Sequence, residues 1–176
     1  MGKTQNTTKE QVTKPKMKTP TRYDCKHLAF LVDFMNATQT SVIALTQSVS
    51  EETSVRNMLR NDNMFLSKAR ELITRQGYKL DVKYTERAQE NNAPSVKINI
   101  KGVPKKTRNP NICFILDALE KRKMTLKELA ERMGVSQGAV WGWVRVDDIR
   151  IAYLQPIGVA LDMDLQYTIE PLQEQK

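Results

Sequence analysis

The chain has 176 residues, of which 40% are hydrophobic and 6% aromatic, a composition that supports small helical units better than one large β-sandwich. The 28 Lys and Arg residues outnumber the 20 Asp and Glu residues, and the net charge of +8 favours an acidic partner such as nucleic acid over a neutral or basic one. The longest apolar run, residues 27–35, contains Asp33 and is too short to cross a bilayer, and no signal peptide is evident, so we expect a cytoplasmic protein with no membrane partner.

Residues 1–22 are rich in Thr, Lys, Gln and Asn and carry almost no large apolar side chains, which predicts a basic, flexible arm. Such an arm would lie along DNA phosphates or enter a minor groove, and a solvated tail is the alternative interpretation. Residues 1–26 and residues 79–110 each carry a surplus of five positive charges, whereas residues 111–176 have a net charge of −2. We therefore expect these basic segments to hold a DNA backbone while helices present side chains to the bases.

Residues 23–78 have the apolar spacing of amphipathic helices and predict a first helical domain. Three apolar faces follow one another, and their side chains are expected to form its core: Leu28, Leu31, Val32 and Met35, then Val42, Leu45, Thr46 and Val49, then Val55, Met58 and Leu66. The turn between the second and third faces contains no glycine.

Residues 79–110 change to the alternating pattern of strands. Leu80, Val82 and Tyr84 alternate with polar residues, and residues 96–100 do the same after a polar loop, which predicts a β-hairpin. A basic linker then carries three side chains that we expect to contact DNA phosphates: Lys105, Lys106 and Arg108.

Residues 111–170 predict a second helical domain with clear start and stop signals. Thr125 and Glu128 form a T-x-x-E capping box, and Gly134 stands where a helix ends in a left-handed residue. Ser136 is placed to cap the next helix. Further apolar positions are expected inside the domain: Leu126, Leu129, Ala130, Met133, Val140, Trp143, Leu154, Ile157, Gly158 and Leu161.

The segment TLKELAERMGVSQGAVWGWVRVDDIRIAYLQPIGVAL, residues 125–161, resembles the Cro/repressor-type helix-turn-helix family, also called lambda-repressor-like or XRE. The resemblance covers Asn111 to about Leu165. It implies a compact helical DNA-binding domain in which LAERMGVSQGAVWGW forms the second helix, the turn and the recognition helix.

The first helical domain is similar to the second at a nearly constant distance along the chain. Apolar positions from Leu28 to Val49 match positions 84 residues later, and positions from Val55 to Leu66 match positions 85 residues later. A third alternating run, residues 165–169, follows the second domain, as residues 80–84 follow the first. We therefore expect a mainly α fold with two tandem lambda-repressor-like domains, the first degenerate, joined by a small antiparallel β-sheet, and a tail at residues 171–176.

In this fold the recognition helix turns one face to the major groove. The second copy offers Gln137, which suits adenine, and Trp141, which suits either a protein contact or a thymine methyl group. The first copy offers side chains that suit bases and phosphates better: Thr53, Ser54, Arg56, Asn57 and Arg60.

Catalytic and metal-binding motifs are missing from the sequence. His27 is the only histidine, Cys25 and Cys113 form no C-x-x-C pair, and no P-loop or nucleophile elbow occurs. The paired carboxylates lie at predicted helix boundaries, where Asp is favoured: Asp147, Asp148, Asp162 and Asp164. We expect no enzymatic activity, no cofactor and no bound metal.

The leading hypothesis is a sequence-specific regulator that binds double-stranded DNA, with two helix-turn-helix units in one chain imitating a repressor dimer of a bacterium, phage or mobile element. The alternative is the same fold reused for protein contacts, to itself or to another protein through Trp141, as an assembly or structural component. An antitoxin is a further alternative.

Overall fold

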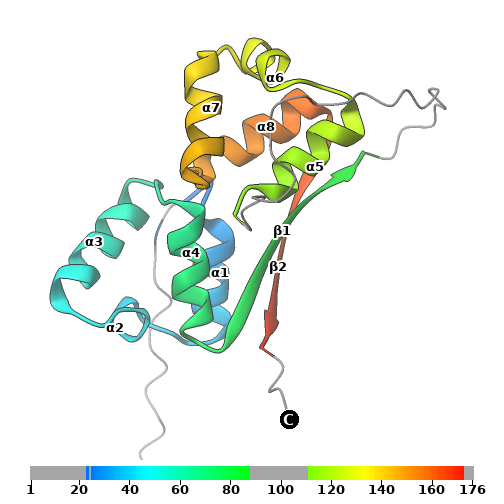
Figure 1. Ribbon diagram of the computed structural model, residues 1–176. Helices are drawn as coiled ribbons and strands as arrows, with labels where there is room; N and C mark the ends of the chain where they lie inside the picture. The colour runs from blue at the N-terminus through cyan, green and yellow to red at the C-terminus, as the bar shows by residue number, and fades with distance from the viewer. Residues whose placement is uncertain (1–22, 24, 88–110, 173–176) are drawn as a thin grey trace, which may run out of the picture.

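The computed structural model describes Tyr23, residues 25–87 and residues 111–172. Over these residues the fold is mainly helical with a small antiparallel sheet, as the sequence predicted (Figure 1). The sheet has two strands in this part of the chain, where the sequence predicted three alternating runs. The arm at residues 1–22, the strand expected at residues 96–100, the phosphate contacts expected at Lys105, Lys106 and Arg108, and the last four residues of the tail all lie outside the described residues.

The first half of the structure, residues 23–87, has four helices and then a strand: α1 (Ala29–Ala37), α2 (Val42–Leu45), α3 (Val49–Arg60), α4 (Leu66–Thr74) and β1 (Tyr78–Glu86). The second half, residues 111–172, has the same order with one short 3₁₀ turn added: α5 (Cys113–Arg122), α6 (Leu126–Met133), α7 (Gln137–Val146), η1 (Ile151–Tyr153), α8 (Leu154–Leu161) and β2 (Met163–Pro171).

The connection between α6 and α7 follows the signals in its sequence. The Thr125 hydroxyl accepts a hydrogen bond from the Glu128 N–H at 3.2 Å, and the Glu128 carboxylate accepts the Thr125 N–H at 2.7 Å, which completes the capping box. Gly134 ends α6 at φ +66°, and Ser136 accepts the Ala139 N–H at 3.2 Å to begin α7. The predicted helix, turn and helix are therefore confirmed in the second half.

The corresponding connection in the first half differs from the prediction. Thr46 and Val49 were expected within one amphipathic helix, but α2 is a single turn that ends before Thr46. Val49 is instead the first residue of α3, with 80% of its side chain exposed, and Ser48 caps that helix by accepting the Glu51 N–H. With no glycine here to take a left-handed conformation, the chain passes from α2 to α3 through extended residues.

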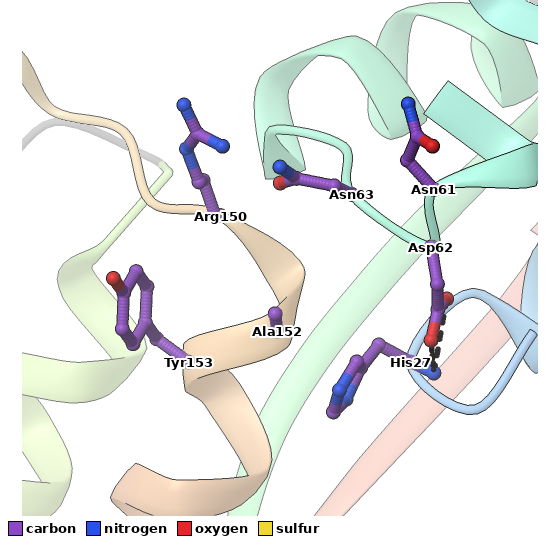
Figure 2. Close-up of a pocket in the computed structure, with 7 residues that line it drawn as sticks. All are labelled: His27, Asn61, Asp62, Asn63, Arg150, Ala152 and Tyr153. Atoms are coloured by element: carbon purple, nitrogen blue, oxygen red, sulfur yellow. Dashed lines mark hydrogen bonds between the residues drawn. The ribbon is translucent and has the colours of Figure 1, made fainter. Parts of the chain in front are cut away.

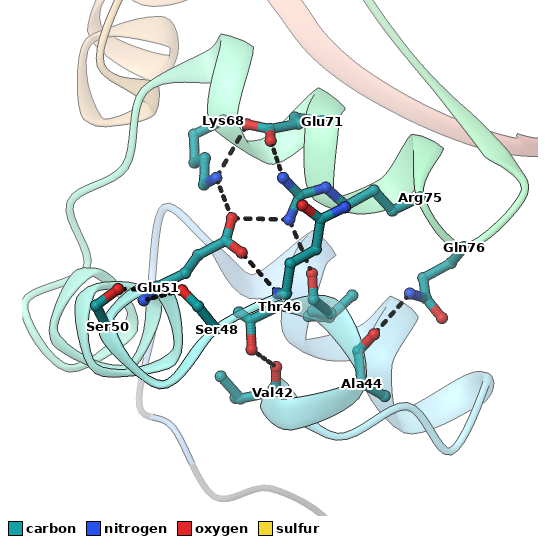
Figure 3. A network of polar contacts seen from close by, with 12 residues as sticks. Val42, Ala44, Thr46, Ser48, Ser50, Glu51, Lys68, Glu71, Arg75 and Gln76 are labelled. Atoms are coloured by element: carbon teal, nitrogen blue, oxygen red, sulfur yellow. Dashed lines mark hydrogen bonds and ion pairs between the residues drawn. The ribbon is translucent and has the colours of Figure 1, made fainter.

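A polar network holds the connection between α2 and α3, where the second half has a glycine turn instead (Figure 3). The Glu51 carboxylate lies 2.6 Å from the Lys68 ammonium and 2.7 Å from the Arg75 guanidinium, and it also accepts the Gln47 N–H at 2.7 Å. The hydrogen bond from Lys68, then the Gln47 N–H and Arg75, hold the pKa of Glu51 down to about 2. Lys68 and Arg75 belong to α4 or its C-terminal end, so the network fastens the start of α3 to α4.

The strands β1 and β2 pair along their whole length, with Tyr78 opposite Pro171 and Glu86 opposite Met163. Each strand closes one half of the structure, so the sheet joins the halves, as expected for residues 79–85 and 165–169. On one face the side chains are buried or half-buried against the helices: Leu80, Val82, Tyr84, Leu165, Tyr167 and Ile169. The helices lie on this face alone (Figure 1), and the other face is mainly polar and exposed.

Tyr84 shows that the two halves share one core. Its ring stacks on Phe114 at 5.5 Å between centroids, and its hydroxyl donates a hydrogen bond to the Leu154 carbonyl at 2.6 Å. Burial raises the pKa of this hydroxyl far above its usual range. A Cβ at Gly158 would lie 3.2 Å from the Tyr84 ring, so the glycine makes room for it. The Tyr84 side chain of a first-half strand therefore packs between helices of the second half.

A second junction links the chain before α4 to the chain before α8. Phe65 and Arg150 form an isolated antiparallel bridge, flanked by hydrogen bonds from the Leu66 N–H to the Ile149 carbonyl and from the Ile151 N–H to the Met64 carbonyl, both 2.9 Å long. The Ser67 hydroxyl and the Asp148 carboxylate reinforce it. Phe65 and Arg150 are 85 positions apart, as are Val82 and Tyr167, which face each other at the middle of the sheet.

Candidate nucleic-acid interface

The helices α3 and α7 are the second members of the pairs α2–α3 and α6–α7. Both lie on the side of the helical layer away from the strands, while α4, α5 and α8 pack on β1 and β2 (Figure 1). Each turns an apolar face inward: Val55 and Leu59 of α3 are buried, as is Val140 of α7. Their other faces are therefore available to a partner.

The outward face of α3 carries the polar side chains that the sequence indicated. Thr53, Ser54, Asn57 and Arg60 are all exposed on this one helix. The Thr53 hydroxyl donates to a backbone carbonyl one turn earlier at 3.0 Å, whereas Asn57 and Arg60 extend a polar surface toward the C-terminal end of α3. These residue types form hydrogen bonds with base edges and phosphates.

Arg56 departs from the expectation of an outward-facing side chain. Its guanidinium is half-buried and lies 2.6 and 2.8 Å from the Glu52 carboxylate, and it also approaches the Tyr23 hydroxyl at 3.5 Å. The hydrogen bond to Glu52 raises the pKa of Arg56. The two residues are four positions apart on a helix, so the pairing follows from their spacing.

The outward face of α7 is mostly apolar. Trp141 is 43% exposed and Val146 is 61% exposed, and Gly138 and Ala139 complete the exposed surface between them and Gln137. Gln137 is exposed, as expected of a residue that could contact adenine. Trp141 is thus on the outer surface, as predicted. α7 offers a mainly apolar face, with Arg145 exposed near its C-terminal end, whereas α3 offers hydrogen-bonding groups.

Trp143 was expected to point inward. It is half-buried against the core, and its ring lies 5.1 Å from that of Tyr153. The buried core positions Leu154, Ile157 and Leu161 of α8 agree with the prediction.

A pocket of about 370 Å³ lies at the second junction, between the C-terminal end of α3 and the chain that follows α7 (Figure 2). Its lining comes from both halves: His27, Asn61, Asp62, Asn63, Arg150, Ala152 and Tyr153. This pocket could not be predicted from the sequence, because its residues are far apart along the chain and form no motif. The only available signal was the equivalence of positions 85 residues apart, which brings Phe65 beside Arg150.

Other types of site find no support in the described residues. There, no three His, Cys, Asp or Glu side chains are grouped so that they could hold a metal ion, and none of the helices has the length and apolar character needed to cross a bilayer. Comparison of the chain with protein-family models, with curated proteins and with solved structures found no match in any of the three.

Proposed function

We propose that the chain binds double-stranded DNA in a sequence-specific manner and regulates transcription, with two lambda-repressor-like domains in one polypeptide acting as a repressor dimer would. The observation that carries this proposal is the register of the pairing at the two places where the halves meet, the β1–β2 sheet and the Phe65–Arg150 bridge. Val82 faces Tyr167 and Phe65 faces Arg150, and each pair joins a residue to the position 85 further along. Residues that face their own counterparts in antiparallel pairs are what a two-fold axis between duplicated units produces.

Other features support the same relation between the halves. The two hydrogen bonds that flank the Phe65–Arg150 bridge are equivalent. The donors Leu66 and Ile151 are 85 positions apart, as are the acceptors Met64 and Ile149, and both bonds are 2.9 Å long. Asp62 and Asp147, also 85 apart, both adopt left-handed conformations after α3 and α7. These equivalences favour a duplicated unit over two unrelated helical segments.

An axis of this kind favours DNA as the partner, because the backbone of duplex DNA has two-fold symmetry as well. It places α3 and α7 on one side of the molecule, as the recognition helices of a dimer are placed for two half-sites. The two helices carry different side chains, so we expect them to make different contacts with DNA. We propose that Asn57 and Arg60 of α3 read bases, and that α7 contributes Gln137 and apolar contacts.

The test is a selected-sequence binding profile for the full chain and for Asn57→Ala and Arg60→Ala. Each variant should lose about 1–3 kcal/mol of discrimination at one base pair while its melting temperature stays unchanged, because both side chains are exposed. Lys79→Ala, on the exposed face of β1, is the matched control. If the parent chain selects no sequence, the proposal is wrong. If Gln137→Ala alone alters the profile, α7 is the reading helix.

A second candidate function is favoured by the surface of α7. The exposed Trp141 and Val146, with the small residues Gly138 and Ala139 in the turn before Trp141, fit a protein partner better than a base edge. In this case the chain is an assembly or interaction component. Sedimentation of the parent chain and of Trp141→Ala over a range of concentrations would reveal self-association that depends on this side chain, with base selection unaffected.

A further inference from the structure

The pocket at the second junction is rich in hydrogen-bond donors. Arg150 is exposed, and its guanidinium lies 5.2 Å above the centre of the Phe65 ring, which holds it in place by a cation–π interaction. Figure 2 shows Arg150 and Asn61 extending in the same direction from opposite sides of the pocket, with the Asn63 amide between them. Guanidinium and amide N–H groups are donors that bind the oxygens of a tetrahedral or planar anion.

The carboxylate that lines the pocket does not oppose an anion strongly. Asp62 accepts hydrogen bonds from three consecutive backbone N–H groups, those of Lys26, His27 and Leu28, at 2.9 Å each at the closest oxygen. The Asp62 carboxylate is therefore bound by backbone N–H groups just before α1. Figure 2 shows this carboxylate directed toward the His27 backbone and away from Arg150.

The two halves differ at this junction. When each pocket residue is compared with the residue 85 positions away, the donors of the pocket are not repeated in the other half. Where the pocket has Asn63, the other side has Asp148, and this carboxylate is bound by the N–H and hydroxyl of Ser67. Where the pocket has Arg150, the other side has Phe65. One side is thus closed by an acid–hydroxyl contact, and the other is open and carries the Arg150 guanidinium.

We infer that this pocket binds a phosphate group, held by the guanidinium of Arg150 with the amides of Asn61 and Asn63. Resting on the proposed function, the phosphate is one of the DNA backbone near the centre of the binding site, since Asn61 directly follows the exposed Arg60 at the end of α3. A contact of this kind fixes the position of the protein on the duplex and carries no base specificity. The same donors would hold the phosphate of a free small molecule.

The first experiment uses pyrophosphate as the probe and the full chain as the receptor. In an NMR titration at constant ionic strength, the side-chain amide signals of Asn61 and Asn63 and the Nε–H signal of Arg150 should shift and saturate. Arg150→Gln should abolish these shifts, and Arg150→Lys should retain part of them, since it keeps the charge but loses the planar fork. Lys83→Gln, on the exposed face of β1, is the matched control and should leave them unchanged.

The second experiment measures duplex binding against salt concentration. Arg150→Gln should reduce the log–log salt slope by about one unit, as the loss of one phosphate contact requires, and Lys83→Gln should not. Pyrophosphate shifts with an unchanged slope would assign the pocket to a free phosphorylated ligand, which overturns the DNA-backbone source. No saturable shift together with an unchanged slope would overturn the pocket itself. If the chain binds no duplex at all, the proposed function fails, while the pyrophosphate titration still decides the pocket.

Discussion

In the second half, the connection between α6 and α7 is determined by residues within it: a capping box at Thr125 and Glu128, a left-handed Gly134 and a cap at Ser136. In the first half, the connection between α2 and α3 depends on side chains from α4 and its C-terminal end, which reach Glu51 and the carbonyls at the end of α2. Similar helix pairs are thus fixed by local signals in one case and by tertiary contacts in the other. The second kind is more sensitive to distant substitutions and to pH.

The largest expected effect concerns the core that both halves share. Tyr84→Ala should destabilise the protein by about 3–5 kcal/mol, because it removes a buried ring and leaves the Leu154 carbonyl without its donor. Ile169, 85 positions later, is only half-buried, so Ile169→Ala should cost less. Urea unfolding of both variants measures the difference. Equal losses would show that the two strands contribute equally to the core.

A smaller effect should test the locally determined connection between α6 and α7. Gly134→Ala should cost about 1–2 kcal/mol, since φ of +66° is unfavourable for a residue with a Cβ, although no atom stands in the way. Gly142→Ala is the control, because Gly142 is inside α7 with open space around it and should gain about 0.5–1 kcal/mol. Thermal unfolding of the two variants should therefore shift in opposite directions. A gain for both would mean that the turn is not held in the left-handed conformation.

The network around Glu51 predicts a pH effect on the connection between α2 and α3. The pKa of this carboxylate is lowered from 4.5 to about 2 in the folded state, so its contribution to stability is complete above pH 4.5 and is lost as the pH falls toward 2. Amide protection factors in α2 and the start of α3 should therefore fall over that range. Glu51→Gln should show lower protection there already at neutral pH, with little further loss on acidification. An equally large loss of protection in α7 would contradict this assignment.

The sequence predicted the elements whose causes are local. The α6–α7 connection, the core positions of α8 and the alternating runs of both strands follow from neighbouring residues, and each is present. The early end of α2 could not be predicted, because Lys68 and Arg75 lie 17 and 24 positions from Glu51. The choice of β2 as the partner of β1 is also a long-range property.

The candidate site divides in the same way. The exposure of Asn57, Arg60 and Trp141 follows from helical periodicity and was predicted. The pairing of Arg56 with Glu52 was missed although its spacing of four residues is a recognisable signal. The pocket beside Arg150 was beyond reach, since it arises where two distant segments cross and no pattern within either one marks it.

The interlocked strands also bear on how the two halves can change over evolutionary time. Because the ring of Tyr84 lies among second-half helices and Tyr167 stacks on Phe30 of the first half, neither half can complete its core without the other. In a homodimer, any substitution appears on both sides of the axis at once. In a single polypeptide, each half can be substituted separately. The chain between Arg87 and Asn111 also keeps the halves together, and its length sets the effective concentration of each half for the other. One unit is then free to acquire a polar outer helix while its counterpart acquires an apolar one, so a duplex contacted by both helices need not carry two identical half-sites.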